Sequence, residues 1–302
     1  MSSSETNSEG GAPRPVAVAL FTLLRPHQWI KNGFVAAPLL FTPAAVSVSS
    51  VATVAAGFAS FCLLSSAAYV INDYIDREAD RQHPEKRDRP LAAGKISTAQ
   101  AAGVLAVLIV VGFSVAATLG PPFLWFVAGY VALNLAYSLK LRQVEILDVL
   151  IIAIGFVLRV YSGAVLIEVV PSAWILICTG LLGLFLALAK RRDDLERQLG
   201  TDHRASLKGY SKEFLDTAIT VVLAALLVAY MIYTTDSQVI ARLGTSQIYL
   251  TTPFVVAGVL RYLQITLVEK RSGSPTRLLF QDQFLRLTIL GWLLTFGLVI
   301  YT

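Results

Sequence analysis

Three aspartates stand at a spacing that suits metal-dependent phosphate chemistry. Asp73, Asp76 and Asp80 occupy positions i, i+3 and i+7, shortly after an uncharged run at 51–70. This spacing places the three carboxylates on one face if the segment is helical. Three like charges repel one another, and such a cluster is tolerated when a cation neutralises it. Hard oxygen ligands favour Mg²⁺, which keeps several waters and shares its coordination with substrate phosphates.

The alternative for this acidic segment is a solvated helix end, at which Arg77 and Arg81 neutralise the acids. Asn72 and Asp73 weigh against it, because they lie where the preceding apolar segment should still continue. Ionisable groups at that depth in a membrane are functional as a rule. We therefore expect the three aspartates to bind Mg²⁺ and Asn72 to orient a ligand.

A second polar cluster, "KRRDDLER" at 190–197, also follows an uncharged run and mirrors the first. Lys190 and Arg191 are candidates for holding phosphate oxygens, since Lys offers a point charge and Arg a planar fork. We expect Asp194 to face the site. The alternative is that the basic residues of this cluster only anchor the membrane topology. Further phosphate-binding candidates along the chain are Arg204, Lys208 and Tyr210.

Other basic residues fall inside apolar segments. Arg159 follows Asp148 by eleven residues, which is about three helical turns, so both should share one face. A buried Arg without an anion nearby is costly, and we expect Arg159 to face a cavity and meet an anion. Arg25 and Lys31, in "LLRPHQWIKNGF", are similar candidates. The alternative role for Arg25 and Lys31 is structural: they would belong to an interfacial belt around Trp29, with their side chains reaching toward the lipid headgroups.

The composition places these residues in an integral membrane protein. Hydrophobic residues make up 55% of the chain and charged residues 15%, against about 25% charged in soluble domains. The mean hydropathy is +0.65. We predict an all-α polytopic fold with nine transmembrane helices in one domain, residues 16–302, after a disordered cytoplasmic tail at 1–15. The predicted spans cover about 21–42, 50–73, 98–118, 122–140, 146–167, 173–192, 213–234, 250–268 and 284–301.

The basic residues predict the orientation of these spans. Loops after the second, fourth, sixth and eighth spans carry nearly all of the Lys and Arg, whereas loops on the other side carry only Arg242. The positive-inside rule then puts the N-terminus, the acidic clusters and the active site in the cytoplasm and the C-terminus outside the plasma (inner) membrane. The net charge of +5 suits anionic lipids or substrates. We expect no nucleic-acid partner, because these residues form no extended basic stripe. A homo-oligomer is possible.

The aspartate motif resembles a known signature. "NDYIDREAD", residues 72–80, is similar to the N-D-x-x-D-x-x-x-D motif of the UbiA-type intramembrane prenyltransferases, and "RDRPLAAGKIS" resembles its continuation in that family. The resemblance covers nearly the whole chain from about residue 20. It implies nine helices around a central cavity that opens laterally to lipid, with Mg²⁺ held by Asp73, Asp76 and Asp80.

The chain departs from the family pattern in its second cluster. Prenyltransferases of this family commonly carry a second D-x-x-x-D motif there, but Asp193 is followed four places on by Arg197. Together with "RPHQWIKN", "YSLKLRQVEILDV" and "VLRVYSGA", this basic stretch resembles the phosphoribosyltransferase branch found in actinobacteria. That resemblance implies a polyprenyl (decaprenyl) phosphate acceptor and a phosphoribosyl pyrophosphate donor. It also implies a role in making the lipid-linked arabinose donor of the cell wall.

With this resemblance, the candidate site residues take roles. Lys86, Arg87, Lys190 and Arg191 would hold the pyrophosphate or the 5-phosphate, and Arg25, Lys31 and Arg159 would hold the lipid phosphate. The acceptor is already an anion and needs no strong general base. The full set of candidate substrate-binding residues is Arg25, Lys31, Asn72, Tyr74, Lys86, Arg87, Tyr137, Arg159, Lys190, Arg191, Asp194 and Lys208.

Two rival functions stay open at this point. A conventional UbiA-type prenyltransferase that acts on an aromatic or haem acceptor would share the fold and the first motif. A cation-coupled transporter would also place acids within its spans, but along a path near the bilayer midplane. Here the acids gather near one face.

Overall fold

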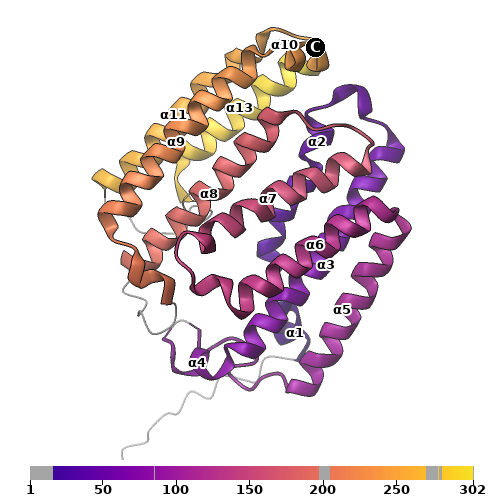
Figure 1. Cartoon of the computed structure of the whole chain (residues 1–302), viewed down its shortest axis with the longest axis vertical. Coiled ribbons are helices and arrows are strands. Elements are labelled where there is room, and N and C mark those ends of the chain that lie inside the picture. The colour runs from indigo at the N-terminus through magenta and orange to yellow at the C-terminus, as the bar shows by residue number, and fades with distance from the viewer. Residues whose placement is uncertain (1–15, 85, 197–204, 270–277, 279–280, 302) are drawn as a thin grey trace, which may run out of the picture.

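Helices run back and forth between the two ends of an elongated bundle (Figure 1). The structure is a computed structural model that describes residues 16–84, 86–196, 205–269, 278 and 281–301. The predicted tail at 1–15 and the candidate Arg204 lie outside these residues. Eight helical segments in the described part of the chain are long and apolar enough to cross a membrane, so the chain is a multi-pass membrane protein.

These eight segments confirm eight of the nine predicted spans, each to within four residues. They are α3 (Val48–Ile75), α5 (Thr98–Thr118), α6 (Pro121–Leu139), α7 (Leu147–Leu166), α8 (Ala173–Glu196), α9 (Lys212–Thr235), the segment Gln247–Val268, which contains α11 (Thr252–Leu263), and α13 (Gln283–Tyr301). The uniformly apolar runs therefore identified the spans correctly.

The first predicted span, at 21–42, is wrong as a single helix. Arg25 has a left-handed backbone conformation, with φ 52°, and Pro26 follows it. Proline disfavours the right-handed helical conformation in the residue before it, so the helix stops there. The segment consists instead of α1 (Val16–Leu24), the 3₁₀ helix η1 (Pro26–Ala36) and α2 (Ala37–Leu40).

Local signals define the helix that carries the aspartates. Helix α3 starts with a capping box, in which Ser47 and Ser50 each accept a hydrogen bond from the other's backbone N–H. It ends at Ile75, and the short helix α4 (Arg77–Gln82) follows Asp76. The backbone N–H of Asp80 still donates to the carbonyl of Asp76, at 2.8 Å, which keeps the chain helical across this junction.

Segment η1 lies between α3 and α7 and contacts both. Gly163 of α7 makes this close approach possible, because a Cβ atom there would lie 1.9 Å from the carbonyl oxygen of Val35. The irregular first segment is thereby brought to the interior of the bundle, next to the helix that carries Arg159.

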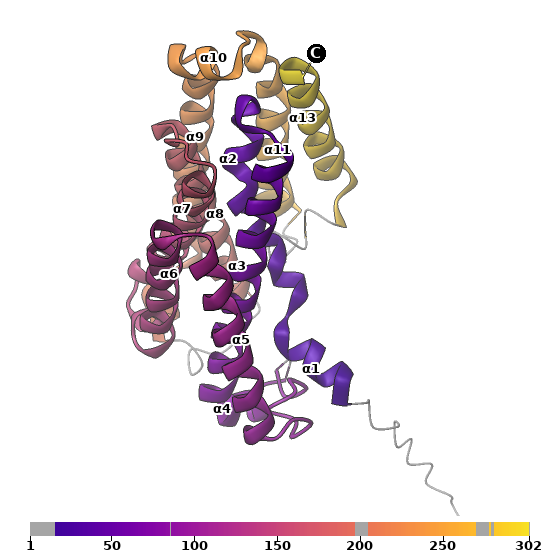
Figure 2. The same ribbon diagram turned by 90° about the vertical axis from the view of Figure 1, so that its right-hand side faces the viewer.

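The two ends of the bundle differ in content. Helix α4 lies at one end, which we call the aspartate end, and the short helix α10 (Ser237–Leu243) lies at the other, which we call the α10 end (Figures 1 and 2). Helix α1 approaches the aspartate end, and the last turn of α13 lies near α10 (Figure 2). The chain thus places its acidic motif and its C-terminal helix end far apart.

Candidate active site

Two of the three motif aspartates converge on one arginine. The Arg89 Nη1 atom lies 3.1 Å from Asp73 Oδ1 and 2.6 Å from Asp80 Oδ2. Arg25 also donates a hydrogen bond to Asp73, at 2.5 Å, and the left-handed kink at Arg25 directs the chain to this point. Asp73 and Asp80 are 2% and 3% exposed. The two buried carboxylates therefore form a cation-binding site. In this structure the guanidinium groups of Arg25 and Arg89 occupy it.

Asp76 points elsewhere and has a different partner. Arg142, in the connection after α6, donates to both of its carboxylate oxygens, at 2.7 and 2.8 Å. Burial raises the pKa of the Asp76 carboxyl group, but these two hydrogen bonds outweigh burial and hold the pKa below its ordinary value. Seven residues return a helix to within about 20° of one direction, whereas three leave a difference of about 60°. This explains why Asp80, and not Asp76, accompanies Asp73.

The expected three-aspartate metal site therefore divides into a pair and a single residue. No group of three His, Cys, Asp or Glu side chains suited to a metal ion occurs in the part of the chain that the structure describes. The pair nevertheless offers hard oxygen ligands aimed at one cation, which is the chemistry that Mg²⁺ prefers. Next to it in sequence, the Asn72 Oδ1 atom is buried without a hydrogen-bond partner among the described residues. An unsatisfied buried acceptor of this kind fits a further ligand to a cation.

Arg159 is buried beside neutral groups. Its guanidinium donates to Asn32 Oδ1 at 2.9 Å, to the carbonyl oxygen of Gly155 at 2.8 Å and to the Tyr130 hydroxyl at 2.5 Å. The residue is 8% exposed, and none of its contacts within the described residues is a carboxylate. Arg159 and Asp148 were expected on one face of the helix, but they do not form an ion pair with each other. Asp148 pairs with Arg191 instead. A buried guanidinium without a counter-charge favours the binding of an anion.

Lys31 lies among three other cations. Lys31, on η1, lies close enough to Arg159, Lys190 and Arg25 to be affected electrostatically by all three. We call these four residues the basic cluster. They come from η1 and its N-terminal flank, α7 and α8, so tertiary packing assembles the cluster. Lys190 also binds Asp194, with 2.6 Å between Nζ and Oδ1, and its side chain is 45% exposed.

The charged residues of the α8 cluster, residues 190–196, form ion pairs both within α8 and with neighbouring helices. Arg191, 1% exposed, donates to Asp148 Oδ2 at 2.6 Å and to the Tyr137 hydroxyl at 3.0 Å. Tyr210 donates to the other oxygen of Asp148, at 2.7 Å. Burial and this hydrogen bond raise the pKa of the Tyr210 hydroxyl, which keeps it a donor. Arg192 binds Asp216 of α9 in the same way.

The remaining candidates lie at the periphery of the site. Lys86 is partly buried and acts electrostatically on Asp76, while Arg87 and Lys208 are exposed. Tyr74 is exposed, and Arg77 lies over its ring at 4.8 Å. Sequence reasoning missed Arg89 and Arg142 as partners of the aspartates. The available signal was their place in loops that were expected on the same side of the membrane as the motif.

Curated relatives match the chain over nearly its full length. The decaprenyl-phosphate phosphoribosyltransferase of Mycolicibacterium smegmatis is 32% identical, over 99% of this chain and 98% of its own. The protein of the same name from Corynebacterium glutamicum is 32% identical, over 98% of this chain and 91% of its own.

A solved structure agrees with the fold. A UbiA homolog from Archaeoglobus fulgidus, described as bound to GPP and Mg²⁺, superposes with a TM-score of 0.70. It covers 94% of this chain and all of its own, at 19% identity, and therefore bears on the fold alone. The UbiA prenyltransferase family model matches residues 33–296. This chain, with its buried aspartate pair among membrane-spanning helices, belongs to the UbiA prenyltransferase family.

Proposed function

We propose that this protein transfers a 5-phosphoribosyl group from phosphoribosyl pyrophosphate to a polyprenyl phosphate, such as decaprenyl phosphate, and releases pyrophosphate. The observation that carries the proposal is the basic cluster beside the aspartate pair. Two phosphorylated substrates bring three phosphate-bearing positions to the site, and they need more positive charge than one prenyl diphosphate with an aromatic ring. The full-length similarity to the two phosphoribosyltransferases supports the same reading.

The donor would bind at the aspartate pair. Asp73 and Asp80, with Asn72, are the residues that would hold Mg²⁺, and a bound Mg²⁺ would supply charge neutralisation for the pyrophosphate leaving group. Arg89 and Arg25, which now hold the pair, have 26% and 21% of their side chains exposed. Guanidinium groups bind phosphate through paired hydrogen bonds, so both arginines are suited to hold the pyrophosphate when the donor is present.

The acceptor would bind at the buried side of the basic cluster. Arg159 and Lys31 would hold the lipid phosphate close to C1 of the ribose. An oxygen of that phosphate forms the new bond to C1, while the bond from C1 to the pyrophosphate oxygen breaks and its electron pair leaves with pyrophosphate. Because the attacking oxygen is already anionic, the reaction needs no general base. Lys190 is accessible enough to hold the 5-phosphate.

The location of the reaction follows from the charge distribution. We propose that the aspartate end faces the cytoplasm across the plasma membrane, because nearly all loop Lys and Arg lie at that end. The phosphoribosylated lipid would then feed the synthesis of a lipid-linked arabinose donor for the cell wall. Assembly into a homo-oligomer is compatible with this reaction.

A direct assay tests the proposed function. Purified protein is incubated with decaprenyl phosphate, Mg²⁺ and phosphoribosyl pyrophosphate that is radiolabelled in the ribose. Label should appear in the lipid phase, and omission of decaprenyl phosphate or addition of EDTA should prevent it. Absence of lipid-phase label, together with prenylation of an aromatic acid from a prenyl diphosphate, would reject the proposal in favour of a conventional prenyltransferase.

A further inference from the structure

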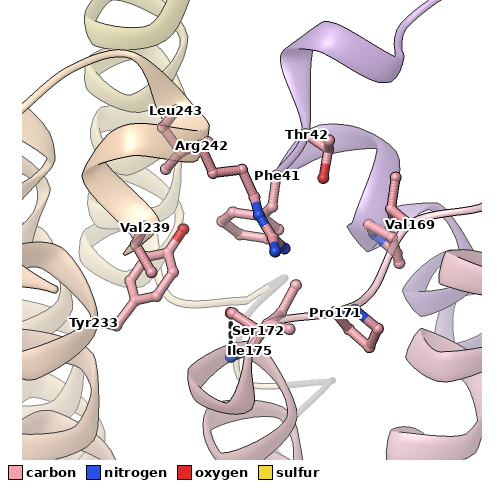
Figure 3. Close-up of a pocket in the computed structure, with 11 residues that line it drawn as sticks. Phe41, Thr42, Val169, Pro171, Ser172, Ile175, Tyr233, Val239, Arg242 and Leu243 are labelled. Atoms are coloured by element: carbon pink, nitrogen blue, oxygen red, sulfur yellow. Dashed lines mark hydrogen bonds between the residues drawn. The ribbon is translucent and has the colours of Figure 1, made fainter. Parts of the chain in front are cut away.

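A pocket with a volume of about 330 Å³, including its open mouth, lies at the α10 end of the bundle. Residues of α2, the connection between α7 and α8, the end of α9 and helix α10 line it (Figure 3). Helix α9 has 24 residues and separates this end from the aspartate end by about 36 Å. The pocket is therefore a separate place from the candidate active site.

Arg242 supplies the positive charge of this pocket. It belongs to the last turn of α10, and its guanidinium points into the pocket towards Phe41 (Figure 3). Among the described residues it has no hydrogen bond or ion pair, although other arginines of the chain, such as Arg89, Arg142 and Arg261, bind carboxylates. The nearby Asp236 is already engaged, because it caps α10 and accepts a hydrogen bond from Trp174. The guanidinium is free to bind an incoming anion.

Tyr233 supplies a second, independent indication of a ligand. The residue is 5% exposed, and its hydroxyl is buried without a hydrogen-bond partner among the described residues. Figure 3 shows the hydroxyl directed into the pocket, and Arg242 is near enough to act on it electrostatically. A buried hydroxyl without a partner costs free energy, which a ligand oxygen in the pocket would recover.

The walls indicate what kind of molecule carries the anion. Pro38, Phe41, Ile175 and Leu243 are apolar, and Thr42 and Ser172 add hydroxyl groups to the lining. The enclosed part of the pocket is narrow and the rest is open to solvent, so only a small group at the end of a larger molecule can enter it. Its position at one end of membrane-spanning helices puts it at headgroup depth.

We propose that this pocket binds a phosphate group, carried by an anionic lipid, at the membrane face opposite the aspartate end. Arg242 pairs with the phosphate, and the Tyr233 hydroxyl donates a hydrogen bond to one of its oxygens. The apolar wall around Phe41 contacts the first carbons of the lipid. The site is independent of the proposed transferase reaction and of its substrates.

The test measures binding and not turnover, so its failure is distinct from failure of the proposed function. Dioctanoyl phosphatidic acid is titrated into the purified full-length protein in neutral detergent, with calorimetric detection. Arg242→Gln should weaken one class of site by about tenfold or more, as expected for a lost charged hydrogen bond, and Tyr233→Phe by a smaller factor. Arg286→Gln, which changes an exposed arginine of α13 away from the pocket, should bind as wild type does.

Two further arms separate the sources of the phosphate. Inorganic phosphate that competes with phosphatidic acid at equal concentration would identify a free anion as the ligand. Failure to compete would identify the lipid. In both cases Arg242→Gln should weaken binding. Dioctanoylglycerol, which lacks the phosphate, should not bind there. Unchanged binding of phosphatidic acid to Arg242→Gln, or equally tight binding of dioctanoylglycerol, would overturn the proposal.

The two variants, Arg242→Gln and Tyr233→Phe, are expected to fold as stably as the wild type, so weaker binding would not reflect misfolding. Arg242 is exposed, and neither its guanidinium nor the Tyr233 hydroxyl has a hydrogen-bond partner within the part of the chain that the structure describes. In lipid-free detergent both variants should melt at or above the wild-type temperature. Added phosphatidic acid should raise the melting temperature of the wild type more than that of either variant. A Tyr233→Phe variant that melts well below wild type without lipid would show that the hydroxyl has a protein partner, contrary to the proposal.

Discussion

The two polar clusters of the aspartate end differ in where their paired charges come from. Around the three motif aspartates, which we call the aspartate centre, the acids belong to one helical stretch, and the arginines that hold them, Arg25, Arg89 and Arg142, come from outside it. In the α8 cluster, Arg191 and Arg192 belong to the helix and bind acids of α7 and α9. They also pair with Asp194 and Glu196 of α8 itself.

The exposure of the paired side chains distinguishes a binding site from a structural ion pair. The arginines of the aspartate centre have between 21% and 26% of their side chains exposed, so they can move to a ligand. The Arg191 and Asp148 side chains are 2% and 0% exposed and bind each other deep between α7 and α8. A buried pair is costly to break, and it orients the helices around it. We therefore expect the first cluster to control turnover and the second to control stability.

The largest expected effect concerns the α8 cluster. Arg191→Ala should lower the free energy of unfolding by about 3–5 kcal/mol, because the buried Asp148 carboxylate would lose its ion pair with Arg191. Thermal melting in detergent measures the change. Arg191→Ala protein that melts like wild type but has lost activity would show instead that Arg191 binds substrate, as the sequence predicted.

The next effect concerns the aspartate pair. Asp73→Asn should reduce transferase activity by about 10²-fold or more, since the pair would lose half of its charge. Loss of Mn²⁺ binding, followed by electron paramagnetic resonance, should accompany it. Asp88→Asn, which changes an exposed aspartate of the following loop, is the matched control and should keep both properties. Asp73→Asn with full activity would eliminate the metal assignment.

Lys190 belongs both to the α8 cluster and to the basic cluster, so it tests whether this end of α8 serves binding or stability. Lys190→Ala should raise the KM for phosphoribosyl pyrophosphate by about tenfold through the loss of one charged hydrogen bond. Its melting temperature should change little, because the side chain is 45% exposed and its ion pair with Asp194 is partly solvated. A large drop in the melting temperature of Lys190→Ala would show that Lys190, like Arg191, serves mainly to stabilise the fold.

The smallest effect is a pH dependence at Asp76. The Arg142 hydrogen bonds depress the pKa of this carboxyl group in the folded protein, so the group binds its proton more readily when unfolded. Its contribution to stability is therefore complete above the unfolded pKa, about 3.9, and disappears as the pH falls through the lower folded pKa. Asp76→Asn should remove this loss, which is at most about 1 kcal/mol for a partly exposed pair. Identical acid melting curves for Asp76→Asn and wild type would contradict it.

Much of the fold was predictable, because membrane helices leave a strong local signal. Eight apolar runs of sufficient length appear as eight helical segments. The prediction for 21–42 failed at Arg25 and Pro26, where the backbone cannot continue as a helix. Hydropathy records the cost of transfer into lipid and does not detect a local change of backbone conformation.

The candidate site was predictable only in part. The motif and its spacing identified Asp73 and Asp80 correctly as neighbours, and the apolar surroundings of Arg159 indicated that it is buried. The separate direction of Asp76 depends on where α3 ends and on the position of Arg142, 66 residues further along the chain. No pattern in the vicinity of Asp76 carries that information.

The sequence by itself determined the membrane class, eight of the nine predicted spans and the acidic motif, because these depend on transfer free energies and on residues close together in the chain. Only the tertiary structure decided which charge meets which. Arg25 reaches Asp73 across 48 residues and Arg191 reaches Asp148 across 43. Such pairs form when packing, here the approach of η1 to α7 at Gly163 and the contact of α7 with α8, brings distant segments within hydrogen-bonding distance. That packing also decides which cluster is accessible to ligands, the aspartate centre, and which is buried, the Arg191–Asp148 ion pair.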